Sequence, residues 1–349
     1  MQVLAIILSV VIFSASIYAW SSLAHIRRVS TRTEYTGHYI TKLKYYEPWD
    51  ELVTVRKTRQ VQKGVDSNGN PIMEEEAYYE DEIHYHEAAF YMVLNSGKTI
   101  EISRGQYSMY NKVMVSKDIY INLHRNYYSI NGNMYLNEWD GRIFTLVTIT
   151  MTEKYTNPVL ATESVFNTSE ITPEEAMNMG LYDYPAIVDH QQRTIIGKEF
   201  DEIDERYYNH ANVMISERNG MRVYLLFFKD KPIEIAEQQK NYWKNGNRNE
   251  VVLCVGIDSQ TDDIQWCHTF SWCDDKSFET KCKQWLVTCK CFDLRVFAKF
   301  MLDNAECIIM KDFSDFEYLL MKKKGTLKII GISTIIVASV LLLIGMLAF

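Results

Sequence analysis

The sequence predicts a mixed protein, α+β with an α/β half, flanked by an N-terminal and a C-terminal transmembrane helix. Three observations predict this class: both ends are apolar and uncharged, the first half reads as antiparallel-rich, and the second contains a βαβ unit. We therefore expect a transmembrane helix at 1–24, a β-rich region at 25–160, an α/β region at 161–324 and a second transmembrane helix at 327–349.

The two ends carry the membrane prediction. Residues 329–349 contain no charged or amide side chain, and residues 1–24 contain no charged one. About 20 apolar residues in a helix that rises about 1.5 Å per residue cover the roughly 30 Å hydrocarbon core of a bilayer. Basic residues flank both segments on their inner sides, and such flanks favour the cytoplasm. We expect an integral membrane protein with two spans, a cytoplasmic central domain and both termini on the far side.

A cleaved signal peptide is the alternative for the first segment. It would need a basic start and a small residue at position 17, where the sequence has Ile17. All seven cysteines lie between Cys254 and Cys307, and an odd number favours a reducing compartment over a disulfide framework. A retained anchor and a cytoplasmic domain agree with both observations.

The net charge of −8 belongs to the middle of the chain, since the ends are uncharged. An acidic domain is a poor partner for phosphate backbones, so we expect no nucleic acid. The expected partners are the lipid bilayer and another protein, and a small-molecule ligand is left open.

The first half is organised by an extended hairpin at 52–86. Its predicted strands are 52–61 and 72–86, joined by a turn at 66–71 that is rich in Asp, Asn and Gly. A turn centred near Asn68 would place Arg56 opposite Glu80, as a solvated ribbon held by cross-strand ion pairs. An exposed hairpin is the simpler interpretation, and a partner surface is the alternative. Further elements are a helix that begins at Ser103, with Gln106 completing a capping box, and strands at 90–95, 99–103, 127–130, 134–136 and 143–155, with a hairpin turn at 131–132.

The second half alternates helices and strands. Pro173 starts one helix, and a second runs from Phe200 to a stop at Gly220. A strand, a helix that ends near Gly246 and another strand then follow within about 37 residues, which predicts a right-handed crossover and a parallel strand pair. The ranges of the remaining elements are 222–228 and 250–258 for those two strands, 264–272 for a third, 276–289 and 293–302 for helices, and 307–310 for a last strand.

Glu82, His84 and His86 are the candidate metal ligands. They alternate on one face of a strand, and one more ligand from a neighbouring strand would complete a divalent metal site. The alternative is an exposed polar face at the base of the hairpin.

The other candidate residues are expected to have structural roles rather than catalytic or metal-binding ones. The cysteines show no CxxC pair, and Cys282 and Cys289 share the apolar face of a helix, so we expect core packing rather than metal binding. His268 lies on an aromatic strand face and is expected to be packed and neutral. The segment 243–250 reads as a loop with some binding potential. No nucleotide, hydrolase, zinc-protease or EF-hand signature is present, so we assign no catalytic residue and no cofactor.

Two resemblances extend beyond these patterns. The segments 243–258 and 266–272 are similar to membrane proteins without an assigned function from Bacteroides-type bacteria and large bacterial viruses. Residues 200–286 resemble the TPM domain in the order of their elements: helix, strand, helix, strand, strand, helix. That resemblance implies a membrane-anchored protein with phosphatase activity or a role in membrane-protein maintenance. Trp266–Trp272 stand where TPM proteins tend to carry a charged strand followed by glycines, and no catalytic residue transfers.

Three functions follow as hypotheses. The first is a membrane-anchored cytoplasmic protein-interaction or assembly module without catalytic activity. The second is a TPM-like membrane-anchored phosphoester hydrolase. The third is a metal-sensing membrane protein that uses His84 and His86.

Overall fold

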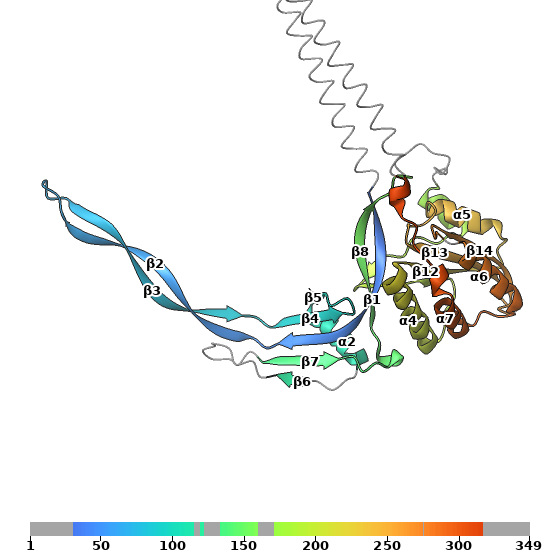
Figure 1. Ribbon diagram of the computed structural model, residues 1–349, viewed down its shortest axis with the longest axis horizontal. Helices are drawn as coiled ribbons and strands as arrows, with labels where there is room; N and C mark the ends of the chain where they lie inside the picture. Colours follow the sequence, from blue (N-terminus) through green and yellow to red (C-terminus); the bar gives the residue numbers. More distant parts are fainter. Residues whose placement is uncertain (1–30, 115–118, 122–132, 160–170, 275, 317–349) are drawn as a thin grey trace, which may run out of the picture. The chain divides into compact units, whose positions relative to one another are not determined.

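The computed structural model describes residues 31–114, 119–121, 133–159, 171–274 and 276–316 (Figure 1). The chain divides into two compact units, which are described separately. Unit 1 comprises residues 1–37 and 150–349, and unit 2 comprises residues 38–149. The division falls within two strands, β1 (Thr31–Tyr46) and β8 (Thr148–Thr156), which pair with each other.

Unit 2 is built on an antiparallel sheet with the strand order β5-β4-β1-β7-β6. One face packs against helix α2 (Arg104–Met114), where Tyr110 and Met114 are buried together with Leu43 and Met92 of the sheet. Ser103 and Gln106 hydrogen-bond each other at the start of α2, as the capping box predicts. The bounds of the other strands are Ala89–Leu94 for β4, Thr99–Glu101 for β5, Ile119–Ile121 for β6 and Met134–Glu138 for β7.

A long two-stranded ribbon also belongs to unit 2. Strand β2 (Trp49–Val65) pairs antiparallel with β3 (Pro71–His86), and the two form a sheet of their own, drawn in blue and cyan in Figure 1. The tip is closed by Asp66, whose carboxylate accepts hydrogen bonds from the backbone N–H groups of Asn68 and Asn70 at 2.9 and 2.8 Å. These bonds lower the pKa of Asp66.

Unit 1 is a three-layer α/β structure. Its sheet has the order β11-β12-β13-β14, and the central pair, β12 (Arg222–Lys229) and β13 (Glu250–Ile257), is parallel. Helix α5 (Glu234–Tyr242) connects this pair, as the crossover pattern predicts. Strand β14 (Ile264–Ser271) adds antiparallel to β13, and the short β11 (Ile195–Ile196) adds parallel to β12.

Both faces of the central pair are buried. Alternate residues, such as Leu225 and Leu253, pack with three helices: α4 (Glu202–Asn219), α6 (Ser277–Thr288) and α7 (Leu294–Asp303). The residues between them pack with α5 and with α3 (Pro173–Met179) in a second cluster. The remaining elements are β9 (Ile187–Val188), β10 (Gln191–Gln192) and three 3₁₀ turns at Ile143–Thr145, Ala305–Cys307 and Phe313–Phe316.

The predicted fold class needs a correction. The described residues form a mixed α/β structure, and within them no helix has the length and apolar character needed to cross a membrane. That finding contradicts the flanking transmembrane helices and the localisation as a two-span integral membrane protein with a cytoplasmic central domain. The segments 1–24 and 327–349 themselves lie outside the described residues.

Smaller differences have local causes. The predicted strand at 143–155 begins only at Thr148, because the Asp140 carboxylate accepts hydrogen bonds from Arg142 and Thr145 and closes a turn there. The predicted strand at 307–310 is reduced to a single bridge between Cys273 and Met310. The predicted elements at 127–130 and 131–132 lie outside the described residues.

The ribbon register also differs from the prediction by one residue. Near the tip, Val65 lies opposite Pro71, which places the centre of the turn at Asn68 as expected. A bulge between Gln62 and Gly64 then adds one residue to β2. Arg56 therefore lies opposite Tyr79 rather than Glu80, and each side chain of β3 meets a different set of β2 neighbours.

Candidate functional site

The two faces of the β2–β3 ribbon differ in chemistry. Because side chains alternate along a strand, odd-numbered residues of β2 share one face with even-numbered residues of β3. We call this the ion-paired face, and we call the opposite one the apolar face. Between the base of the ribbon and the bulge, the apolar face comprises the even-numbered residues 50–62 of β2 and the odd-numbered residues 73–85 of β3.

The ion-paired face is held by cross-strand contacts. The Lys57 ammonium lies between two carboxylates, 2.9 Å from Glu80 and 2.5 Å from Glu82. Arg59 donates to Glu76 at 3.1 Å and lies over the ring of Tyr78. The hydrogen bond from Lys57 lowers the pKa of Glu82, and the two carboxylates raise the pKa of Lys57. The ribbon therefore satisfies these charges internally.

The apolar face exposes large side chains in a row. All its residues at 52–62 and 73–85 are solvent-exposed, including five large apolar or aromatic ones. The exposed fractions are 43% for Leu52, 52% for Met73, 71% for Tyr79, 51% for Ile83 and 61% for Tyr85. Single exposed apolar residues are ordinary, but several on one face of one element indicate an interaction surface.

Charged residues on the apolar face lie opposite uncharged ones. Arg56 lies opposite Tyr79, Asp81 opposite Thr54, and Glu75 opposite Gln60. The Thr54 hydroxyl donates to Asp81 at 2.6 Å. No two like charges are direct neighbours across these strands.

The three predicted metal ligands all lie on the ion-paired face, but with different partners. His84 Nε2 is 3.5 Å from Glu82, which also binds Lys57. His86 Nε2 is 2.8 Å from Glu51, and its ring stacks on Trp49 with centroids 4.2 Å apart. In the part of the chain that the structure describes, no group of three or more His, Cys, Asp or Glu residues is placed to hold a metal ion. Metal binding at these residues stays a prediction.

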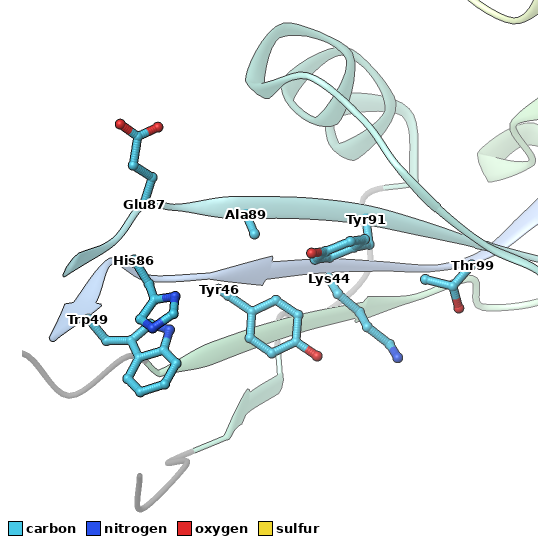
Figure 2. A pocket seen from close by; sticks show the side chains of 8 residues that line it. All are labelled: Lys44, Tyr46, Trp49, His86, Glu87, Ala89, Tyr91 and Thr99. Atoms are coloured by element: carbon cyan, nitrogen blue, oxygen red, sulfur yellow. The ribbon is translucent and has the colours of Figure 1, made fainter. Parts of the chain in front are cut away.

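A shallow hollow of about 380 Å³ lies at the base of the ribbon (Figure 2). The stacked Trp49 and His86 form one end, and Tyr46 and Tyr91 lie beyond them with ring centroids 5.7 Å apart. The other lining residues are Lys44, Glu87, Ala89 and Thr99. Glu87 points away from the others in Figure 2, so the hollow is an aromatic surface with one ammonium group at its side.

Unit 1 contains a buried polar cluster around Glu250. Glu250 is 1% exposed, accepts hydrogen bonds from the side chain and the backbone of Asn247 at 2.7 and 2.8 Å, and also binds the Tyr184 hydroxyl. Burial and the Glu250 charge raise the pKa of Tyr184. Each carboxylate oxygen has a partner, so the cluster reads as structural.

The predicted loop at 243–250 is held in the same region. Arg32 donates to the carbonyls of Trp243 and Gly246 at 2.9 and 2.8 Å. Arg248 makes two 2.7 Å hydrogen bonds to Glu34, which is 4% exposed. Gly246 has a φ of 74°, a left-handed conformation that favours glycine. These contacts fix the loop.

The cysteines and His268 lie in or beside the core of unit 1. All seven cysteines are free, and Cys254 and Cys282 are fully buried. Burial raises the pKa of both thiols and so disfavours the reactive thiolate. His268 is half-buried beside Glu237 at 3.2 Å, and burial lowers its pKa. Cys282 and His268 match the structural roles that the sequence favours, whereas Cys289 follows the last residue of α6 and is only half-buried, and Cys291 is exposed.

No family model matches this chain, and comparisons with curated proteins and with solved structures find no similar protein. The resemblances to membrane proteins of bacteria and bacterial viruses, and to the TPM domain, therefore stay predictions.

The apolar face was not predicted from the sequence. The signal was present in the odd-numbered positions of β3, where Met73, Tyr79, Ile83 and Tyr85 recur among acidic residues. Because the bulge was not predicted, the β2 residues that share this face with them could not be assigned.

Proposed function

We propose that this chain is a protein-interaction module whose β2–β3 ribbon is a docking arm, and that the apolar face binds another protein. The observation that carries this proposal is the separation of the two faces. The inter-strand ion pairs lie on one face, and Leu52, Met73, Tyr79, Ile83 and Tyr85 lie exposed on the other. Tyrosine and methionine are also enriched where proteins bind one another.

The two-stranded form of the ribbon supports the binding of a partner on one face rather than a role as a passive spacer. A two-stranded sheet has no core, so neither face is needed to bury side chains within the ribbon. Polar side chains on both faces would suffice for a solvated spacer. The ribbon instead places its cross-strand ion pairs on one face and leaves large apolar side chains exposed on the opposite face, where a partner can bind them.

The charges also disfavour pairing at the ribbon edges. Charged residues on exposed strands discourage uncontrolled strand addition. β3 carries six acidic residues, Glu74, Glu75, Glu76, Glu80, Asp81 and Glu82, and β2 carries four basic ones, Arg56, Lys57, Arg59 and Lys63. Contact through the face is therefore the arrangement that buries apolar area without opposing like charges.

Two neighbouring tyrosines provide the test. Tyr79 is on the apolar face, and Tyr78 lies under Arg59 on the ion-paired face. A photo-crosslinking amino acid is placed at either position in the full chain, and expressing cells are illuminated. We expect a discrete crosslinked species from position 79 and little or none from position 78. Equal yields from both positions, or none from position 79, would overturn the proposal.

A further inference from the structure

We propose that the partner of the apolar face is a second copy of this chain, with two ribbons packed face to face about a two-fold axis that runs along their length. This inference rests on the proposed function and names its partner. Three features of the apolar face support this partner: the order of its side chains, its charges and its area.

The order of side chains is self-complementary in this packing. A two-fold axis along the ribbon places β2 of one copy over β3 of the other at the same level. Each residue therefore faces the partner's equivalent of its own cross-strand neighbour. Leu52 faces Ile83 of the second copy, and Arg56 faces the ring of Tyr79. The first contact buries two aliphatic side chains, and the second places a guanidinium on an aromatic face.

The charges on the apolar face are compatible with this arrangement. Asp81 faces Thr54 of the second copy and Glu75 faces Gln60, so no like charges meet directly. Asp81 is also one step along the face from the partner's Arg56, a diagonal distance that these side chains can bridge. The two-fold axis would create this contact twice.

Side-by-side pairing of two ribbons does not share these advantages. β2 beside β2 would bring together Arg56, Lys57 and Arg59 of the two copies, and β3 beside β3 would bring together their acidic runs. β2 beside β3 would match the charges but would leave Tyr79 and Ile83 exposed. Face-to-face packing keeps like charges apart and also buries Tyr79 and Ile83.

The area is that of a reversible dimer. Strands of this length extend about 50 Å at about 3.3 Å per residue, and two strands are about 10 Å wide. Each ribbon would then contribute about 500 Å², for a total near 1,000 Å², which is at the lower limit for a specific interface. We therefore expect association that depends on concentration.

The first experiment is analytical ultracentrifugation of the purified full chain over a range of concentrations. We expect a monomer–dimer equilibrium that Ile83→Asp weakens at least tenfold, since the charge would face Leu52 of the second copy. His84→Asp, one residue along and on the ion-paired face, is the matched control and should leave the equilibrium unchanged. If Ile83→Asp does not fold, Tyr79→Ala replaces it.

The second experiment tests the axis. Chains with Gln60→Cys are treated with a bismaleimide that spans about 10 Å, the spacing of packed sheets. An axis along the ribbon keeps position 60 of the two copies at the same level, so these chains should crosslink to each other above the background of the native cysteines, measured with the unsubstituted chain. Val61→Cys, on the ion-paired face, is the matched control and should stay at that background. Gln60→Cys chains that do not exceed it would overturn this packing, because an axis across the ribbon would separate the two positions.

The two proposals fail in different ways. A chain that is monomeric at every concentration but crosslinks from position 79 to a different protein overturns the second copy as partner and leaves the docking arm intact. A monomeric chain without any crosslink from position 79 overturns both. Equal loss of the dimer in Ile83→Asp and His84→Asp would assign the contact to neither face and contradict the inference.

Discussion

Two strand pairs in this molecule, the parallel β12–β13 pair and the antiparallel β2–β3 ribbon, are stabilised in different ways. β12 and β13 are eight residues long each, and except for Lys229 all their residues are buried. β2 and β3 are about twice as long, and none of their residues is buried. The first pair is stabilised by helices on both faces, and the second by contacts between its own strands.

The two strand pairs differ in which side chains are available to a partner. In the β12–β13 pair the buried side chains all contribute to packing, so none of them is available to a partner without cost to the fold. In the ribbon, stability depends on one face, and the other can vary with little effect on folding. Substitutions should therefore reduce stability in the first pair and association in the second.

The largest effect is expected in the core. Leu253 of β13 is fully buried, and Leu253→Ala should reduce the free energy of unfolding by about 2–5 kcal/mol. Ile83→Ala removes a comparable side chain from the ribbon and should stay within about 0.5 kcal/mol of the unsubstituted chain. Urea unfolding of both variants measures the difference, and similar losses in the two would contradict the comparison.

The next effect concerns a buried ion pair. Arg248→Ala leaves Glu34 buried without its two charge-assisted hydrogen bonds, and we expect a loss of about 2–3 kcal/mol. Arg295 makes a similar pair with Asp204 at the surface, so Arg295→Ala is the control and should not change the unfolding midpoint measurably. A midpoint for Arg248→Ala that matches this control would show that the pair is not stabilising.

At Tyr78 and Tyr79 we expect small effects on stability. A large effect on association is expected at Tyr79 alone. Tyr79→Ala should weaken association at least tenfold and leave thermal unfolding unchanged. Tyr78→Ala removes the ring under Arg59 on the ion-paired face and should leave association intact. Sedimentation and thermal unfolding of both variants would distinguish these results, and the reverse pattern would exchange the roles of the two faces.

The smallest effect is a shift in pH dependence. Lys57 lowers the pKa of Glu82, so this contact stabilises the ribbon above the unfolded pKa near 4.5 and is lost as the pH falls through the lower folded value. Lys57→Gln should raise the pKa of Glu82 toward its ordinary value, which an NMR titration of the side-chain carbonyl would measure. An unchanged titration would mean that Lys57 does not hold this carboxylate.

Strong local patterns were predictable from the sequence. The turn at Asp66, the capping box at Ser103 and the helix end at Gly220 lie where turn and capping chemistry places them. The α5 crossover was predictable because two apolar strands flank an amphipathic helix. These features depend on residues close together in the chain.

Features that depend on distant partners were not predictable. No element was predicted at β1, because its buried residues, Glu34, Gly37, Ile40 and Leu43, recur every third position instead of every second. Its neighbours change along its length, from β8 to β4 and β7. The ribbon bulge lies beside Gly64, a residue type that often marks a bulge, but its position is fixed only by the pairing with β3, and it decides which β2 residues share a face with Tyr79 and Ile83.

The most direct test of the ribbon as a two-faced docking arm is a photo-crosslinking scan over positions 78 to 85, one position per chain. We expect yields that alternate with a period of two, high at 79, 81, 83 and 85 and low at 78, 80, 82 and 84, since only the first set lies on the apolar face. A flat profile, or maxima at the even positions, would contradict the account.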